Sequence, residues 1–431
     1  MKKLLTVLLL LVFCAAALAA GPRDTPKPQI SEQEFWEILN GGKTLEIMGA
    51  LMKGAPLEAR DAKGRTPLLW AIWEEDESLA VLLINAGANV EARDAKEKNT
   101  PLICAIEDGL STVARVLIEK GADVNATGED RTTPLHVAVE ERNEEIVRLL
   151  LEKGAKVSAI DENGDTPLLL AAEQDVPSIV ELLIAAGADI EFTDEDVGLP
   201  LVRAAYENRP GMVAFLLDKG ADIERREGGE DDGQTALFAA AKKGNAAVAA
   251  LLLDRGAKIE TACEDGRTPL LAAASGRKTD AVKLLLDRGA NIAAADEYGR
   301  TALVTAADGG NIETVALLLD RGADTAAADK NGDTALLFAA ERGNFDMVRL
   351  LHERGAKLDV RGKNGQTALS RAVQYGRTPD LALWLLDQGV DAGGTYPFKN
   401  SRLTLAELLA VNKRMKDSPK KAELARRLGA N

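Results

Sequence analysis

The chain has 431 residues, of which 46% are hydrophobic and 4% aromatic, and its formal net charge is −15 at pH 7. A single hydrophobic core stops growing at roughly 250 to 300 residues, so this length requires several domains or an array of repeats. The low aromatic content favours small, closely packed helices over a sandwich or barrel, and the negative charge disfavours nucleic acid and anionic lipid as partners.

Residues 1–19 differ in composition from the rest of the chain. Lys2 and Lys3 form a short basic start, Leu4 to Phe13 is an apolar run, and Ala17-Leu18-Ala19 matches an A-x-A cleavage site. We predict a cleaved signal peptide and a periplasmic or secreted mature protein. A membrane anchor is the alternative, but the apolar run is shorter than the ~20 residues of a spanning helix.

Cys14 raises the further alternative of a lipid-anchored protein. The residue before it is Phe13, where the lipoprotein pattern has a small side chain, so we do not expect lipidation. No later stretch is apolar enough to span a bilayer, which predicts no membrane span in the mature chain. Residues 20–30 are rich in proline and are predicted to be a linker.

After this linker the sequence repeats with a period of 33 residues. One complete copy reads Asp161-Glu162-Asn163-Gly164-Asp165-Thr166-Pro167-Leu168, followed by an alanine-rich segment, Leu182-Leu183 and Gly187-Ala188. A threonine marks the same phase in most copies, and Leu199 replaces it in one, which gives ten repeats: Thr66, Thr100, Thr133, Thr166, Thr235, Thr268, Thr301, Thr334 and Thr367. A fixed period of this length is typical of a solenoid.

Each mark of the repeat predicts a local structure. The Asp-x-x-Gly stretch suits a tight turn, the threonine hydroxyl can cap a helix, and proline fits the first helical position. The alanine five positions after the threonine, such as Ala171, is small enough to let neighbouring helices approach closely. A second helix carries the Leu-Leu pair and is predicted to end at a glycine, as at Gly87, Gly121 and Gly289.

The period, together with the motif Thr133-Pro134-Leu135-His136, resembles the ankyrin-repeat family. The resemblance covers nearly all of the mature chain. It implies an all-α solenoid of helix-turn-helix repeats with β-turn fingers. One repeat cannot bury its own apolar face, so the ends need caps. We predict an N-terminal capping repeat at residues 31–60, ankyrin repeats at 61–394 and C-terminal capping helices at 395–431.

Side chains suited to catalysis or metal binding are scarce. The histidines, His136 and His352, lie in separate repeats and have no Cys or His neighbour at metal-ligand spacing. His136 stands at the motif's own histidine, where the resemblance implies that it holds loops together. No G-x-S-x-G, P-loop or C-x-x-C motif is present. We therefore predict no cofactor, no metal and no enzymatic activity.

The two cysteines of the mature chain are predicted to remain unpaired. Cys104 and Cys263 lie five repeats apart. Stacked repeats then separate them by several interhelical spacings, whereas a disulfide needs Cα atoms within about 7 Å. We expect both to be small apolar fillers.

Positions that vary between repeats predict a binding surface. The resemblance implies that a partner protein binds the turn tips and the exposed side of the first helices. Acidic side chains gather at the tips in the middle of the array, which predicts an edge for a partner with a basic patch. The candidates are Asp130, Asp165, Asp196, Asp231 and Asp265. Ordinary solvated turn chemistry is the alternative.

Aromatic residues of the first helices form the second set of candidates: Trp70, Trp73, Tyr206, Phe338 and Tyr375. Tryptophan and tyrosine are common anchors of protein interfaces. For Trp70 and Trp73, packing against the N-terminal cap is the alternative.

The sequence thus predicts a monomeric, exported binding protein that holds a partner protein on its turn tips and concave first-helix face. A structural scaffold or spacer in the cell envelope is the alternative. An enzyme is disfavoured, because no acid, base or nucleophile can be named. The positions that repeat encode the fold alone, so the partner's identity does not follow from them.

Overall fold

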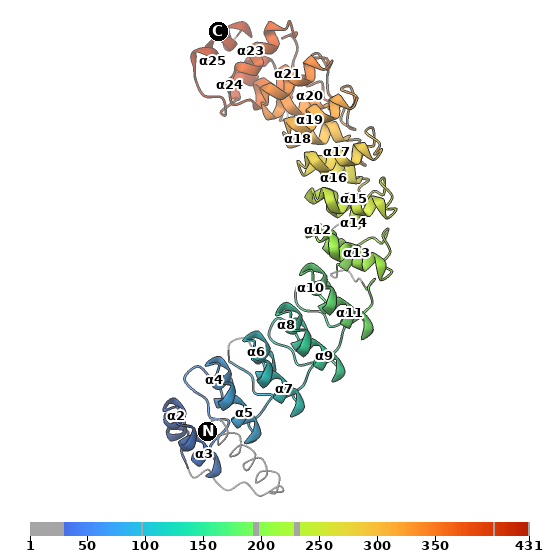
Figure 1. Ribbon diagram of the computed structural model, residues 1–431. Coiled ribbons are helices and arrows are strands. Elements are labelled where there is room, and N and C mark those ends of the chain that lie inside the picture. The colour runs from blue at the N-terminus through green and yellow to red at the C-terminus, as the bar shows by residue number, and fades with distance from the viewer. Residues whose placement is uncertain (1–29, 96–97, 193–197, 228–232, 400, 430–431) are drawn as a thin grey trace. The chain divides into compact units, whose positions relative to one another are not determined.

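The computed structural model describes residues 30–95, 98–192, 198–227, 233–399 and 401–429. The predicted signal peptide and all but the last residue of the linker lie outside the described residues, as do Asp196 and Asp231. The described part divides into two compact units, and the second begins at Leu201. Each unit is built from successive helix pairs (Figure 1).

The described part of the first unit holds a terminal helix pair followed by further pairs in the phase of the repeat. The terminal pair, at the position predicted for the N-terminal cap, is α2 (Glu32–Asn40) and α3 (Thr44–Met52). The first helices of the repeats are α4 (Pro67–Trp73), α6 (Pro101–Glu107), α8 (Pro134–Glu140) and α10 (Pro167–Glu173). Their second helices are α5 (Glu77–Asn85), α7 (Ser111–Glu119), α9 (Glu144–Glu152) and α11 (Pro177–Ala185).

The second unit continues the pattern and ends in a different structure. Its first helices are α12 (Pro200–Tyr206), α14 (Ala236–Lys243), α16 (Pro269–Ser275), α18 (Ala302–Gly309), α20 (Ala335–Arg342) and α22 (Ala368–Tyr375). Its second helices are α13 (Pro210–Asp218), α15 (Ala246–Asp254), α17 (Thr279–Asp287), α19 (Ile312–Asp320), α21 (Phe345–Glu353) and α23 (Asp380–Asp387). The prediction of an all-α solenoid is confirmed for the repeats of both units.

The repeat's threonine starts the first helices, as predicted. The hydroxyls of Thr66, Thr100 and Thr166 accept hydrogen bonds from the amides three residues on, at 3.4, 3.4 and 3.2 Å. These bonds satisfy amides that a helix N-terminus leaves unpaired. Thr334 is an exception, because its hydroxyl is buried and has no hydrogen-bond partner in the described part of the chain.

Small and branched apolar side chains form the core of each unit. The alanines five positions after the threonines are inaccessible to solvent where first helices stack, and so is one leucine of each second helix. In the first unit these residues are Ala71, Ala105, Ala138, Ala171, Leu83, Leu117, Leu150 and Leu183, all at 0% exposure. A side chain larger than alanine has no room between first helices packed at this density.

The turns between repeats are tight and contact one another. The Asp161 carboxylate accepts from the amides of Asn163 and Asp165 at 2.9 and 2.8 Å, which is the turn predicted from Asp-x-x-Gly. The Glu162 amide then donates to the carbonyl of Asp130, one repeat earlier, at 2.9 Å. Backbone hydrogen bonds therefore join neighbouring turns, in addition to the packing that joins neighbouring helices.

The predicted ends of the second helices are confirmed. Each C-cap residue is followed by a glycine with positive φ, and the angles at Gly87, Gly121 and Gly289 are 95°, 88° and 90°. This region of backbone space is accessible to glycine without the penalty that a Cβ atom imposes.

Residues 395–404 depart from the capping helices predicted to begin at 395. Strand β1 (Tyr396–Phe398) pairs antiparallel with β2 (Ser401–Leu403), with Tyr396 opposite Leu403. Aromatic residues favour extended backbone, and the hairpin buries the Tyr396 side chain completely. Helices α24 (Leu405–Val411) and α25 (Pro419–Arg427) follow. Asn412 joins them to the array by donating to the carbonyls of Val373 and Gly376 at 2.8 and 2.9 Å.

Candidate protein-binding surface

In several repeats the residue before the capping threonine contacts the residue seven positions after that threonine. Arg65 lies with its guanidinium 4.5 Å from the ring centroid of Trp73. Asn99 donates to Glu107 at 3.3 Å, and Gln366 donates to Gln374 at 3.0 Å. The turn tip and the C-terminal end of the following first helix therefore form one surface.

The structure separates the two predicted tryptophans. Trp70 is half-buried and packs edge-on against Trp36 of α2, with ring centroids 6.0 Å apart. This is the alternative considered from the sequence, packing against the N-terminal helix pair. Trp73, one turn further on, is 57% exposed and has Lys63 and Arg65 over its ring, at 4.7 and 4.5 Å from the centroid.

Trp73 borders a groove between two successive repeats of the first unit. Helix α4 supplies Leu69 and Trp73, and α6 supplies Cys104 and Glu107. We call it the Trp73 groove; it has a volume of about 490 Å³ and is lined by Lys63, Arg65, Leu69, Trp73, Asp94, Ala95, Cys104, Glu107 and Asp108. Apart from Trp73, none of these residues was among the predicted candidates. The pairing of positions before and after the threonine is the signal that would have found Arg65 and Glu107.

Carboxylates gather where the first helices of the first unit end. They form what we call the acidic row: Glu74, Glu75, Glu107, Asp108, Glu140, Glu141 and Glu173. Partial burial and the nearby Glu75 raise the pKa of Asp108. Partial burial also raises the pKa of Glu140, and the carboxylates of Asp161 and Asp130 add to the effect. The row is thus a region where negative charges repel one another.

The tip aspartates among the described residues bond within their own turns and to neighbouring turns. Asp130 accepts from the Thr132 amide at 3.1 Å, and the Asp165 carbonyl accepts from the Asp161 amide at 3.1 Å. Asp265 accepts from the Cys263 thiol at 2.7 Å and pairs with Arg267. Burial alone would raise the pKa of Asp265, but these hydrogen bonds outweigh it and the pKa is lowered. Their geometry fits turn chemistry, and their role in binding stays a prediction.

His136 holds two neighbouring turns together. Its Nδ1 lies 2.8 Å from the Thr133 hydroxyl and accepts from the Thr133 amide at 3.3 Å, so its Nε2 carries the proton that reaches the Asp165 carbonyl at 3.1 Å. Burial lowers its pKa, which keeps the ring neutral. The structural role that the motif implies for this histidine is the one observed.

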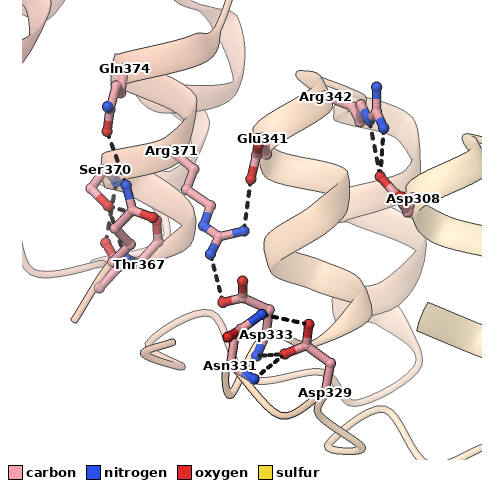
Figure 2. A network of polar contacts seen from close by, with 11 residues as sticks. Asp308, Asp329, Asn331, Asp333, Glu341, Arg342, Thr367, Ser370, Arg371 and Gln374 are labelled. Atoms are coloured by element: carbon pink, nitrogen blue, oxygen red, sulfur yellow. Dashed lines mark hydrogen bonds and ion pairs between the residues drawn. The ribbon is translucent and has the colours of Figure 1, made fainter. Parts of the chain in front are cut away.

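Arg371 of α22 makes the most enclosed ion pairs described in the second unit. Its side chain is 5% exposed, and Nη1 donates to Glu341 at 2.9 Å while Nη2 donates to Asp333 at 2.6 Å. Figure 2 shows Arg371 reaching from its own repeat to both carboxylates of the preceding one. Asp333 and Glu341 occupy the two positions that pair elsewhere, and Arg371 bridges them because two carboxylates cannot bond each other.

Two turns also carry a glycine that accommodates the preceding repeat. A Cβ at Gly128 would collide with the side-chain oxygen of Asn99, and a Cβ at Gly362 would collide with a carboxylate oxygen of Asp333. Asn99 and Asp333 both stand directly before the threonine that marks the phase of their repeats. A polar side chain at that position therefore fills space that belongs to the next turn.

The remaining aromatic candidates lie in the second unit and are half-buried. Tyr206 has the Lys243 ammonium 3.8 Å from its ring centroid. Phe338 lies on α20 and Tyr375 is the last residue of α22.

The described residues offer few side-chain groups for metal binding or catalysis. No group of three or more His, Cys, Asp or Glu side chains there could hold a metal ion. No disulfide joins Cys104 to Cys263, and burial raises the pKa of Cys263 to about 11, so Cys263 stays protonated and weakly nucleophilic. None of the described helices combines the length and apolar character needed to cross a bilayer.

Comparison with known proteins identifies the family to which this architecture belongs. No curated protein matches the sequence. The family model for ankyrin repeats (3 copies) matches in overlapping segments that extend from residue 37 to residue 395. These matches cover most of the chain and coincide with the helix pairs described above, and the protein therefore belongs to the ankyrin-repeat family.

Proposed function

We propose that this protein is exported and that it binds a partner protein through its turn tips and the exposed face of its first helices. Ankyrin repeats are generally protein–protein interaction modules and are typically not enzymes. The observation that carries the proposal is Trp73, which is 57% exposed beside a groove although the neighbouring Trp70 is packed against α2. Exposed tryptophans beside polar groups are typical anchors of interfaces.

Export rests on the composition of residues 1–19. We infer cleavage after Ala19, a periplasmic or extracellular location and a monomeric mature protein. N-terminal sequencing of the protein from fractionated cells tests the first two inferences: a mature chain starting at Ala20 supports them, and an intact Met1 in the cytosolic fraction contradicts them. Light scattering of the purified protein tests the third.

Partner binding is testable by crosslinking in living cells. A photoreactive aromatic amino acid, which keeps a ring at the anchor position, replaces Trp73 in one variant and Glu119 of α7 in a matched control. We expect Trp73 to give a crosslink to one protein, competed by the unlabelled chain and weakened by salt. The absence of any Trp73-specific product would contradict the binding function.

A structural spacer is the second candidate, and one feature favours it. Arginines at the ends of second helices pair with acids of the preceding repeat, as in Arg255–Asp218, Arg288–Asp254 and Arg321–Asp287, at 2.9, 2.7 and 2.7 Å. Such a series fastens neighbouring repeats without forming a binding site. A spacer would give several weak crosslinks from both positions in the same experiment.

A further inference from the structure

The Trp73 groove joins an aromatic ring to charges of both signs. Lys63 and Arg65 stand over the exposed Trp73 ring, and the next repeat contributes Glu107 and Asp108 to the lining. Arg65 pairs with Asp61 through Nη2 at 2.7 Å, but its buried Nη1 has no hydrogen-bond partner in the described residues. A ligand with a cation fits the exposed ring and the carboxylates of this groove.

The acidic row extends from the groove along the C-terminal ends of the first helices, where negative charge destabilises a helix. The C-terminal end of a helix carries partial negative charge and is stabilised by cations. Yet α4, α6, α8 and α10 carry no basic residue in their last turns, and the last three end in glutamate. Some first helices of the second unit differ, because α14 ends in Lys242 and Lys243 and α20 ends in Arg342, whereas α16, α18 and α22 carry no basic residue in their last turns.

This placement makes bound cations favourable. Burial and the neighbouring carboxylates raise the pKa values of Asp108 and Glu140, so each pays a free-energy cost for staying ionised. A cation held at the row lowers that cost and complements the helix ends at the same time. Complementarity to the helix ends alone gives no reason for carboxylates at these positions.

We propose that the Trp73 groove and the acidic row bind an extended, arginine-containing segment of a partner protein. One arginine lies in the groove, with its guanidinium against Trp73 and within reach of Asp108. Arginine fits better than lysine, because its planar cation stacks on aromatic rings and remains charged. The inference deepens the binding function proposed above and rests on it.

The repeat geometry sets the spacing of the partner's arginines. Packed helices lie about 10 Å apart, and an extended segment in the polyproline II conformation advances about 3.1 Å per residue with three residues per turn. Every third residue of such a segment therefore meets the next repeat from the same side. Arginines at that spacing would meet the ends of α4, α6, α8 and α10 in turn.

The test uses the purified protein and the fluorescent peptide (Arg-Gly-Ser)4. A second peptide of equal composition has all its arginines adjacent at one end. We expect saturable binding of the first peptide, weaker binding of the second, and a decrease in affinity with salt. Equal affinity for the two peptides would overturn the proposed spacing.

Substitutions in the groove and the acidic row test where the peptide binds. Trp73→Ala and the double variant Asp108→Asn/Glu140→Gln should each weaken binding of (Arg-Gly-Ser)4 by roughly tenfold. The control Glu119→Gln/Glu152→Gln makes the same charge change on second helices and should leave affinity unchanged. Asp108→Asn/Glu140→Gln should also melt at a slightly higher temperature than the wild type, because it removes repulsion. A lower melting temperature would mean that these carboxylates serve the fold, and unchanged affinity in both test variants would overturn the site.

The in-cell crosslink separates this inference from the function on which it rests. If Trp73 crosslinks one protein and Asp108→Asn/Glu140→Gln does not reduce the yield, the binding function stands and the arginine site is wrong. If no position gives a specific product, the binding function itself fails. A reduced yield in the double variant, with the control variant unchanged, supports both.

Discussion

Nη2 of Arg371 lies 2.6 Å from Oδ1 of Asp333, which belongs to the preceding repeat, and the two side chains are 5% and 15% exposed. Removing one member of an enclosed ion pair leaves the other charge without compensation. Arg371→Leu is therefore expected to destabilise the second unit by about 3 kcal/mol. Urea unfolding followed by the fluorescence of Trp384, in the adjacent α23, measures the change.

Neutralising the carboxylates is the control for this variant. Asp333→Asn/Glu341→Gln, added to Arg371→Leu, should restore part of the lost stability because no unpaired charge remains. If the triple variant were no more stable than Arg371→Leu alone, packing of the arginine stem and not charge would explain the loss.

The contact between Asn99 and the turn of the next repeat gives a second prediction. Gly128→Ala places a methyl group against the Asn99 side-chain oxygen and should cost roughly 1 to 3 kcal/mol through overpacking. Asn99→Ala opens the space, so the double variant should be more stable than Gly128→Ala. Thermal melting of the single and double variants provides the comparison, and strictly additive losses would contradict it.

His136 predicts a pH dependence of stability. Burial lowers its pKa in the folded state, although the carboxylates of Asp161 and Asp130 oppose the shift. The unfolded chain, with an ordinary histidine pKa near 6.5, then binds a proton more readily than the folded chain. Stability should be complete above about pH 6.5 and should fall as the pH drops towards the lower folded-state pKa.

Denaturant midpoints across this pH range measure the effect for the wild type and His136→Gln. The variant should lose the pH dependence in this window, whereas the control His352→Gln retains His136 and should keep it. A wild-type midpoint that does not change between pH 7 and pH 5 would contradict the prediction.

The two tryptophans of α4 are predicted to respond differently to truncation. Trp70→Ala removes the edge-on contact with Trp36 and should destabilise the first unit by roughly 2 kcal/mol. Trp73→Ala, at a side chain that is 57% exposed, should change stability by no more than about 0.5 kcal/mol. Circular dichroism during heating distinguishes the two. Equal losses would show that Trp73 supports the fold as well.

Much of the fold can be predicted from the sequence because each repeat contains the same local signals for its turn, its helix starts and its helix ends. Thr166 caps its helix, Asp161 closes its turn and Gly187 ends the second helix, as their residue types predict. Residues 395–404 lie beyond the last repeat, so no phase marks were there to indicate the hairpin. Its strands form because burial of Tyr396 outweighs a helical continuation.

The candidate surface was harder to predict because it depends on contacts between repeats. Trp70 and Trp73 differ in their neighbours, not in residue type, and only the position of Trp36 assigns one to packing. The sequence predicts that Asp265 is an exposed acid, yet its carboxylate accepts a hydrogen bond from Cys263 and pairs with Arg267 within its turn. The role proposed for Asp108 and Glu140 in binding depends on their position at the ends of helices.

The glycines at 128 and 362 bear on how such an array can be inherited. Each is matched to a polar residue in the repeat before it, Asn99 in one case and Asp333 in the other. A duplication or exchange that moved only one member would set a side chain against a Cβ atom, or leave an unfilled space. The repeats share one fold, but these matched pairs fix which repeat can follow which. Recombination should therefore preserve the array best when it transfers both partners of a pair together.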